Sequence, residues 1–194
     1  MSIPPTLPSE YDSIDEALTD LCEGLCDHPR LCRHCELTEP NHVPSPFYEL
    51  LVHEKHMTTV LSEYYGGAVA LRVLGDKLDG DVYRRRIALT LADRNEIVEL
   101  GLVRIDLRHT PRDVRAAILE RHTPLGDILT RHDVLRRIEP KWFLHLAPEC
   151  GLLGDIRDGL DGEIYGRVGT IHCNDAAAIQ LLEIVTGVSV ENNA

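Results

Sequence analysis

From residue 68 onward, the chain contains segments in which apolar and polar residues alternate. This alternation predicts strands, because successive side chains of a strand point to opposite faces of a sheet. A turn at ADRN and a turn at NDA each join two neighbouring segments, which predicts an antiparallel sheet. The predicted strands are AVALRVLGDKL (68–78), DVYRRRIALTL (81–91), EIVELGLVRIDL (96–107), EIYGRVGTIHC (163–173) and AAAIQLLEIVTGV (176–188).

Helical patterns lie in separate parts of the chain. SPFYELLVHEKHMTTVLSEYYGG begins with Ser-Pro and ends with a glycine pair, which predicts one helix over 45–67. Thr110-Pro111 and Thr123-Pro124 each combine an N-cap residue with proline at the first helical position and predict two further helices. A short helix is also expected near the N-terminus, with one apolar stripe formed by Ile14, Leu18, Leu21 and Leu25. Segregated helices and neighbouring strands indicate an α+β fold, an antiparallel sheet flanked by helices.

The 194 residues are enough for one packed domain with a small appendage. We expect residues 1–45 to be a Cys/Pro-rich extension and residues 46–194 to be the main domain. No apolar run is long enough to span a membrane and no signal peptide is recognisable, so a cytoplasmic location is expected. A formal net charge of −12 argues against a nucleic acid or an anionic membrane as partner and leaves a small molecule. The sequence does not indicate the oligomeric state.

Arg85 occupies an unusual position in the predicted strand 81–91. Alternation places it on the same face as the bulky residues Tyr83, Ile87 and Leu89, while Arg84 shares the more polar face. Burying an unpaired guanidinium is costly. Arg85 therefore needs a partner, either within the protein or on an anionic ligand.

Glu183 presents the same problem with the opposite charge. It lies in a strand whose two faces are both largely apolar, so its carboxyl group is expected to be buried in either orientation. Two accounts are open at this point. In the structural account, Arg85 and Glu183 form an internal ion pair. In the functional account, both line a closed pocket, where Arg85 receives a ligand carboxylate and Glu183 handles a hydroxyl group or a proton.

Five motifs occur in the order found in the chorismate lyase family, also known as chorismate pyruvate-lyases or 4-hydroxybenzoate synthases. LLVHEKHMTTVLSEYYGGAVALRVL is similar to the first helix and strand of that family, and HTPLGDIL to its Thr-Pro-Leu-Gly motif. YRRRIAL resembles the strand with the carboxylate-binding arginine, which falls on Arg85. IYGRVGTIHC resembles the Gly-Arg strand, and LLEIV resembles the strand with the active-site glutamate, here Glu183. The resemblance covers residues 48–188 and is carried by the combination of motifs.

The resemblance implies a fold with an internal ligand cavity and a lyase that removes pyruvate from chorismate to leave 4-hydroxybenzoate. It implies catalysis without cofactor or metal. Arg85 would hold the ring carboxylate in a bidentate grip, and Glu183 would act as general acid or base. Met57, Leu125 and Gly126 would complete the substrate-binding site. Arg167, and after it His172, are secondary candidates, although such strand residues more often have no ligand.

The chain departs from the family in two places. The turn before Glu183, NDAAAIQLL, lacks the Gly-Lys-Pro approach of the bacterial enzymes, and APECGLLGDIRDGLDGE is an insertion of this chain. If these changes turn Glu183 away from the cavity, the chain would have the fold of the family but not its catalytic activity.

A cysteine cluster lies outside the resemblance. The run CEGLCDHPRLCRHC places four thiols at spacings that suit a structural zinc ion with four sulfur ligands. The alternative is that these residues are buried or loop cysteines that bind no metal. The four candidate ligands are Cys22, Cys26, Cys32 and Cys35.

Two classes of function follow from the sequence. The first is a chorismate lyase-like enzyme. The second is a non-catalytic domain that binds or senses an aromatic carboxylate, because related folds serve as effector-sensing domains of transcription regulators. No helix-turn-helix for binding DNA is recognisable in the sequence. The combination of Arg85 with Glu183 favours the enzyme, since a carboxylate sensor needs only the arginine.

Overall fold

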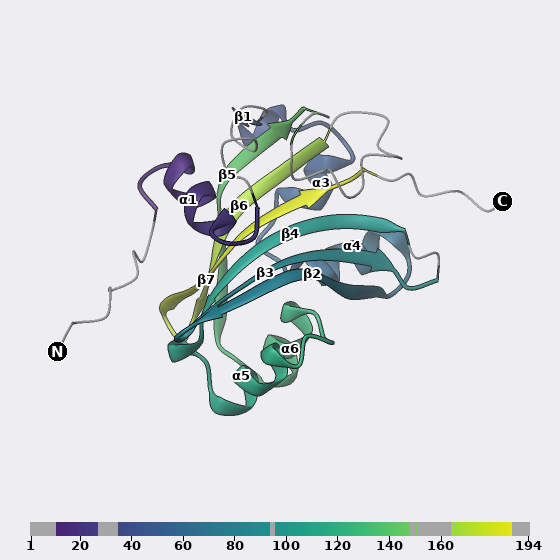
Figure 1. Ribbon diagram of the computed structural model, residues 1–194. Coiled ribbons are helices and arrows are strands. Elements are labelled where there is room, and N and C mark those ends of the chain that lie inside the picture. The colour runs from purple at the N-terminus through teal and green to yellow at the C-terminus, as the bar shows by residue number, and fades with distance from the viewer. Residues whose placement is uncertain (1–10, 27–34, 94–95, 148–149, 151–163, 188–194) are drawn as a thin grey trace.

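The computed structural model describes residues 11–26, 35–93, 96–147, 150 and 164–187. Its strands form a single sheet in the order β1-β5-β6-β7-β4-β3-β2, and all neighbours are antiparallel (Figure 1). The strands are β1 (Cys35–Thr38), β2 (Val69–Asp79), β3 (Val82–Leu91), β4 (Ile97–Asp106), β5 (Arg136–Leu146), β6 (Ile164–Cys173) and β7 (Ala176–Val185). The helices are α1 (Ile14–Cys22), α3 (Phe47–Leu51), α4 (Met57–Tyr65), α5 (Arg112–Leu119) and α6 (Leu125–Arg131), with 3-10 turns η1 (Pro40–His42) and η2 (Leu107–His109). The expected α+β class is confirmed.

The hairpin turns have the backbone geometry that their sequences favour. Gly80, between β2 and β3, has a φ of +59°. Asn174 and Asp175, between β6 and β7, have φ values of 48° and 66°. Asn, Asp and Gly tolerate this left-handed conformation better than other residues, so these turns set the strand pairs that follow.

The single helix predicted over 45–67 is wrong in its middle, where residues 52–56 separate α3 from α4. The backbone oxygens of Leu51 and His53 accept hydrogen bonds from Nη1 of Arg167, at 2.9 and 2.7 Å. A continuous helix would use such carbonyl groups for its own hydrogen bonds. The break therefore supplies acceptors to a buried arginine.

Two other local features differ from the sequence prediction. The two Thr-Pro helices exist, but Pro111 and Pro124 are themselves the N-cap residues and no side chain caps either helix. Strand β5 was not predicted at all. Charged residues and Pro140 interrupt its alternation, and the register with β6 shifts between Pro140 and Trp142.

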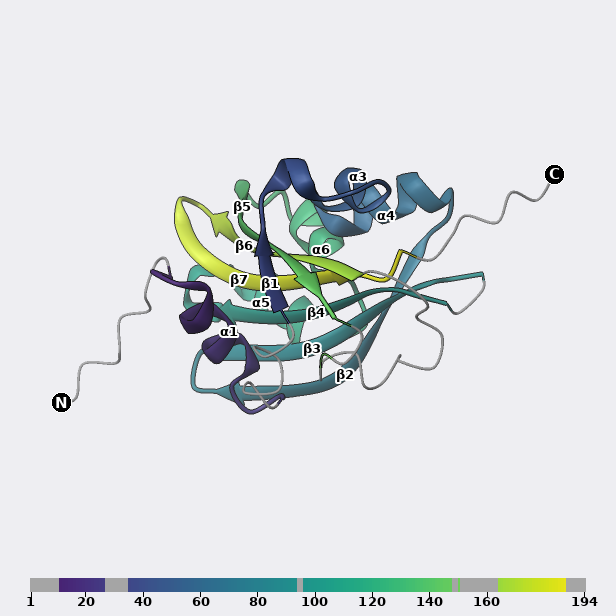
Figure 2. The same cartoon turned by 90° about the horizontal axis from the view of Figure 1, so that it is seen from above.

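The two faces of the sheet are covered by different helices (Figures 1 and 2). On one face, Leu18 and Leu21 of α1 pack into a cluster with Leu102 of β4 and Leu182 of β7. On the other face, Leu61 of α4 packs with the neighbouring β3 residues, and α5 and α6 cover the adjoining part of the sheet. The sheet is thus a central layer with hydrophobic clusters packed on both of its faces.

The described residues before position 46 pack against this same sheet. The predicted helix near the N-terminus is confirmed as α1, which Ser13 caps by accepting a hydrogen bond from the Glu16 amide at 3.2 Å. Strand β1 pairs with β5 at the edge of the sheet. No helix in the described part of the chain combines the length and the apolar character that crossing a membrane requires.

Candidate functional site

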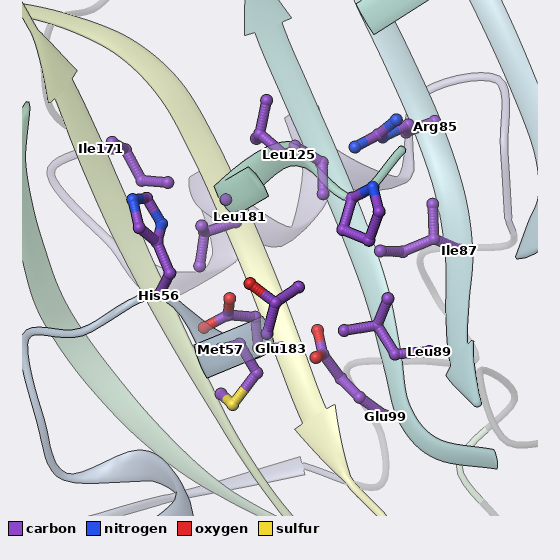
Figure 3. Close-up of a pocket in the computed structure, with 14 residues that line it drawn as sticks. His56, Met57, Arg85, Ile87, Leu89, Glu99, Leu125, Ile171, Leu181 and Glu183 are labelled. Carbon is purple, nitrogen blue, oxygen red and sulfur yellow. The ribbon is translucent and has the colours of Figure 1, made fainter. Parts of the chain in front are cut away.

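A cavity of about 50 Å³ lies between the sheet and helices α4 and α6 (Figure 3). Its walls are mostly apolar side chains from β3, β4, β6, β7 and α6. Five of the residues predicted from the sequence line this cavity, although they are far apart in the chain. They are Met57, Arg85, Leu125, Gly126 and Glu183.

Arg85 reaches the cavity from β3 and is fully buried, with 0% of its surface exposed. None of its three guanidinium nitrogens has a hydrogen-bond partner among the described residues. Burial lowers the pKa of Arg85, while Tyr83 and Asp76 act in the opposite direction. Because an arginine stays charged at neutral pH, this site holds a buried cation with unsatisfied donors.

Glu183 projects into the same cavity from β7, so the departures noted in its surroundings have not turned it away. Its carboxylate accepts a hydrogen bond from Nε of Arg167 at 2.6 Å. The two residues lie directly opposite each other on β6 and β7. The structural account, an ion pair between Arg85 and Glu183, is therefore wrong: Glu183 has a different arginine as its partner.

Arg167 does not line the cavity, contrary to the expectation that it binds substrate directly. Its side chain is almost entirely buried behind Glu183, where it also donates to the backbone oxygens of Leu51 and His53. Its Nη2 donates to the backbone oxygen of Lys55 at 3.4 Å, so all three guanidinium nitrogens have protein acceptors. Arg167 holds Glu183 in place and ties the α3–α4 connection to the sheet.

Glu99 is a third charged residue of the cavity, and the sequence analysis missed it. It lies on β4, two residues before Gly101, which is the direct partner of Glu183 on β7. Burial and the neighbouring Glu183 raise the pKa of Glu99 well above its usual range, and Arg167 opposes this shift. Its Oε2 atom has no hydrogen-bond partner in the described structure. A glutamate in an otherwise apolar alternating strand was the available signal, the same signal that identified Glu183.

The segment entering α4 closes the cavity on the helical side. Burial, then Arg136 and Arg167, lower the pKa of His56 to about 4, so its ring is neutral at pH 7. A Cβ atom on Gly126 would lie 2.7 Å from Oγ1 of Thr58 and 3.0 Å from the His56 side chain. Only glycine allows α6 to approach α4 this closely. The glycine of the Thr-Pro-Leu-Gly motif therefore has a packing role at the cavity wall.

The remaining candidates lie elsewhere. His172 contacts Glu139 at 3.1 Å and does not line the cavity.

Cys22 is buried in α1, Cys26 and Cys35 are half-buried, and Cys32 lies outside the described residues. Within the described ranges, no group of three or more histidine, cysteine, aspartate or glutamate residues is placed to hold a metal ion. The zinc site stays a prediction, since one of its four ligands is not described.

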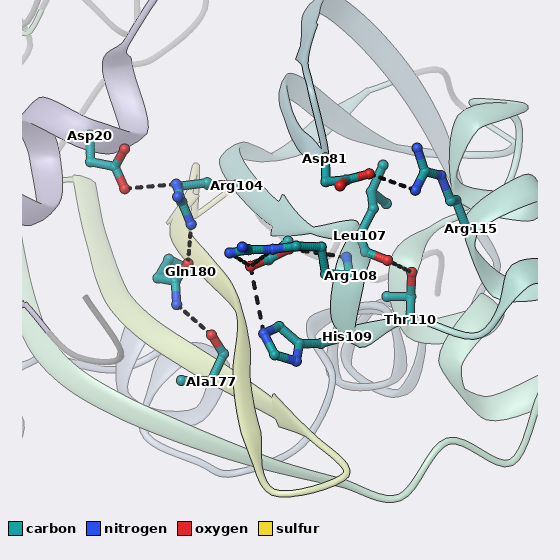
Figure 4. Close-up of polar contacts among 11 residues, drawn as sticks. Asp20, Asp81, Arg104, Leu107, Arg108, His109, Thr110, Arg115, Ala177 and Gln180 are labelled. Carbon is teal, nitrogen blue, oxygen red and sulfur yellow. Dashed lines mark hydrogen bonds and ion pairs between the residues drawn. The ribbon is translucent and has the colours of Figure 1, made fainter. Parts of the chain in front are cut away.

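The opposite face of the sheet has buried arginines as well, but these have partners. Arg104 lies between Asp20 of α1, at 2.9 Å, and Oε1 of Gln180, at 3.2 Å (Figure 4). Arg84 contacts Asp20 and Glu23, each at 2.6 Å. Helix α1 and its C-cap residue Glu23 thus supply the carboxylates that pair with the buried arginines of this face.

Comparisons with known proteins support the fold of this chain. No family model matches the chain, and no curated protein matches it. The fold is similar to the crystal structure of PhnF from Mycobacterium smegmatis, with a TM-score of 0.53 and 11% sequence identity. The match covers 70% of this chain and only 65% of PhnF. At this identity the likeness concerns the fold alone, an α+β, chorismate lyase-like fold with an antiparallel sheet flanked by helices.

Proposed function

We propose that this protein binds a small aromatic carboxylate in the cavity between the sheet and helices α4 and α6. The observation that carries the proposal is Arg85, a fully buried guanidinium without a hydrogen-bond partner among the described residues. A buried donor left unsatisfied costs about 1–3 kcal/mol, and more when the group is charged. A carboxylate matches the planar donor fork of arginine and satisfies two of its nitrogens at once.

The rest of the cavity supports an aromatic ring between its polar groups. The side chains of Ile87, Leu89, Val103 and Leu181 provide apolar walls, and the neutral His56 adds no charge. The cavity of about 50 Å³ has room for one or two water molecules. A ring must therefore displace side chains on entry, and Met57 in the cavity wall has an unbranched, flexible side chain that suits such a displacement.

The test is calorimetric titration of the purified protein with 4-hydroxybenzoate and with 4-hydroxybenzamide. The two molecules have similar size and shape, but the amide carries no negative charge. We expect the acid to bind at least about 30-fold more tightly, because a charge-assisted bidentate contact contributes about 2 kcal/mol or more. Equal affinities, or no binding of the acid, would contradict the assignment of Arg85 as the carboxylate site.

The second candidate function is the lyase reaction that the family resemblance implies. It is favoured by the position of Glu183, which faces the same cavity as Arg85 and is fixed by Arg167 at 2.6 Å. In chorismate, one ring C–H bond and the C–O bond to the enolpyruvyl group would break. The ring becomes aromatic, and the proton and the leaving group end together as pyruvate. Glu183 would accept the proton from the ring carbon, and Arg85 would orient the ring through its carboxylate.

Catalysis is tested by incubating the protein with chorismate and measuring pyruvate and 4-hydroxybenzoate together. Formation of both products in equal amounts above the uncatalysed background would support the lyase. Glu183→Gln should then reduce turnover much more than the affinity for 4-hydroxybenzoate, as expected of a residue that transfers a proton. Binding of 4-hydroxybenzoate without turnover of chorismate would reject the lyase and leave a binding domain.

A further inference from the structure

We propose that Glu99 is a second ligand-binding residue of the cavity, that it is present there in its acid form, and that together with Glu183 it selects ligands with a hydroxyl group opposite the carboxylate. The inference deepens the proposed function and rests on it. It concerns the end of the cavity away from Arg85, where Figure 3 shows the carboxyl groups of Glu99 and Glu183 beside the apolar wall.

The placement of the two carboxyl groups follows from the sheet. Gly101 and Glu183 are paired across β4 and β7, and Glu99 is paired with Val185. Glu99 and Glu183 are therefore diagonal neighbours on one face of adjacent strands, a distance that long side chains bridge readily. Gly101 has no side chain to separate them, and a Cβ atom there would lie 3.4 Å from Oε1 of Glu99.

Two carboxyl groups share this end of the cavity, but only one arginine binds there. Arg167 is engaged with Glu183 and with backbone oxygens. Glu99 makes no ion pair among the described residues, and its Oε2 has no partner. Two adjacent buried carboxyl groups that share one neighbouring arginine repel each other when both are ionised, which favours a state in which one of them holds a proton. The group without the arginine is Glu99.

The charged and titratable groups around Glu99 come from three strands and from the residue that precedes α4. Glu183 lies on β7, Arg167 on β6 and Arg85 on β3, and His56 precedes α4. Burial and Glu183 favour the acid form of Glu99 by raising its pKa, and Arg167 opposes them. His56 is neutral at pH 7 and adds no positive charge.

With Glu99 in its acid form, the net charge of the cavity favours the binding of one monoanion. Arg85 and Arg167 contribute two positive charges and Glu183 one negative charge, which leaves one positive charge for the ligand. If Glu99 were ionised as well, the cavity would already be neutral and would bind an anion less well. Protonation of Glu99 is thus linked to anion binding.

The same protonation state provides both halves of a hydroxyl site. A protonated Glu99 donates a hydrogen bond, and the Glu183 carboxylate accepts one. A hydroxyl group both accepts and donates, so it satisfies both residues at once. An amine attached to the ring mainly donates, and an unsubstituted ring leaves both carboxyl groups without a ligand contact. The expected order of affinity is therefore 4-hydroxybenzoate, then 4-aminobenzoate, then benzoate.

The decisive experiment compares these three acids by calorimetry in the wild type, Glu99→Gln and Glu99→Leu. In the wild type, 4-hydroxybenzoate should bind at least about 10-fold more tightly than benzoate, the effect of one or two buried hydrogen bonds. Glu99→Gln retains a donor and should keep most of this preference. Glu99→Leu has no donor, and its preference should fall to about 2-fold or less. An unchanged preference in the leucine variant would overturn the inference.

The protonation state is tested separately, without reliance on ligand discrimination. Infrared spectra of the free protein at about pH 7 should show the carbonyl band of a buried protonated carboxyl group, and Glu99→Gln should lack it. Thermal unfolding establishes that both variants are folded. Absence of the band in the wild type would overturn the acid form of Glu99.

These outcomes separate the inference from the proposed function. If no acid binds the wild type, the proposed function fails and the hydroxyl site fails with it. If all three acids bind equally well, the carboxylate site stands and the role of Glu99 is rejected.

Discussion

Two neighbouring arginines of β3 occupy similar depths in the protein and have opposite surroundings. Arg84 is 6% exposed, and it contacts Asp20 of α1 and Glu23, the residue that caps the C-terminus of α1, each at 2.6 Å. Arg85 is 0% exposed and has no hydrogen-bond partner for its guanidinium among the described residues. Because consecutive strand residues face opposite sides of the sheet, one arginine lies under α1 and the other in the cavity.

The difference shows that burial alone does not mark a functional arginine. A buried guanidinium with well-placed carboxylates is ordinary internal structure, even when it is nearly inaccessible. A buried guanidinium without acceptors lowers the stability of the free protein, and a ligand can recover that free energy on binding. The unsatisfied donors of Arg85 therefore carry more information about function than its depth.

The largest loss of stability is expected when Arg167, the arginine paired with Glu183, is replaced. Arg167→Met should lower the free energy of unfolding by about 3–5 kcal/mol, because it leaves the Glu183 carboxylate buried without its cation. Urea denaturation of the wild type and the variant measures the difference. A loss below about 1 kcal/mol would show that Glu183 is not dependent on Arg167.

Replacement of Arg85, the unpaired arginine, should not destabilise the protein. Arg85→Met fills the same space without a charge, so the free energy of unfolding should stay equal or rise. Affinity for 4-hydroxybenzoate should fall by about 2–4 kcal/mol, roughly 30-fold to 1000-fold. Parallel denaturation and titration experiments measure the two changes. A destabilised variant with unchanged affinity would contradict the contrast between Arg84 and Arg85.

Arg84→Met is the matched control on the other face. We expect a loss of about 1–3 kcal/mol in the free energy of unfolding, less than for Arg167, because Glu23 is more than half exposed and solvent screens part of the interaction. Affinity for 4-hydroxybenzoate should not change, since α1 and the cavity lie on opposite faces. A large loss of affinity in this folded variant would mean that the two faces are coupled.

The last effect is gradual and concerns pH. The pKa of Glu99 is raised in the folded protein above its ordinary value of 4.5, so between these two values the unfolded chain binds fewer protons. The free energy of unfolding contributed by this group therefore decreases as pH rises above 4.5, by at most about 1.4 kcal/mol per pH unit. Glu99→Gln should remove this decrease. A constant difference between wild type and variant from about pH 5 to about pH 8 would contradict the assignment.

Much of the fold could be predicted from local patterns. The alternation of β3 placed Arg85 with Tyr83, Ile87 and Leu89, and the structure agrees, since Arg85, Ile87 and Leu89 line the same cavity. The turn at Asn174 and Asp175 predicted the β6–β7 pair. Strand β5 was missed because Pro140 and its charged neighbours hide the alternation.

The pairing of arginines with carboxylates could not be predicted in the same way. Arg84 pairs with Asp20, which lies 64 residues earlier in the chain, and no local sequence pattern links the two residues. Counting from the β6–β7 turn without a bulge would put Leu182 opposite Arg167. The register shift between Ile171 and His172 moves Glu183 into that position instead. A bulge of one residue thus decides which arginine Glu183 binds.

The most direct test of the central claim is a crystal structure of the protein with bound 4-hydroxybenzoate. The account predicts the ligand inside the cavity, with its carboxylate oxygens about 2.7–2.9 Å from the guanidinium nitrogens of Arg85. The ring hydroxyl should then lie between Glu99 and Glu183. A ligand bound elsewhere, with the donors of Arg85 still unsatisfied, would contradict the account.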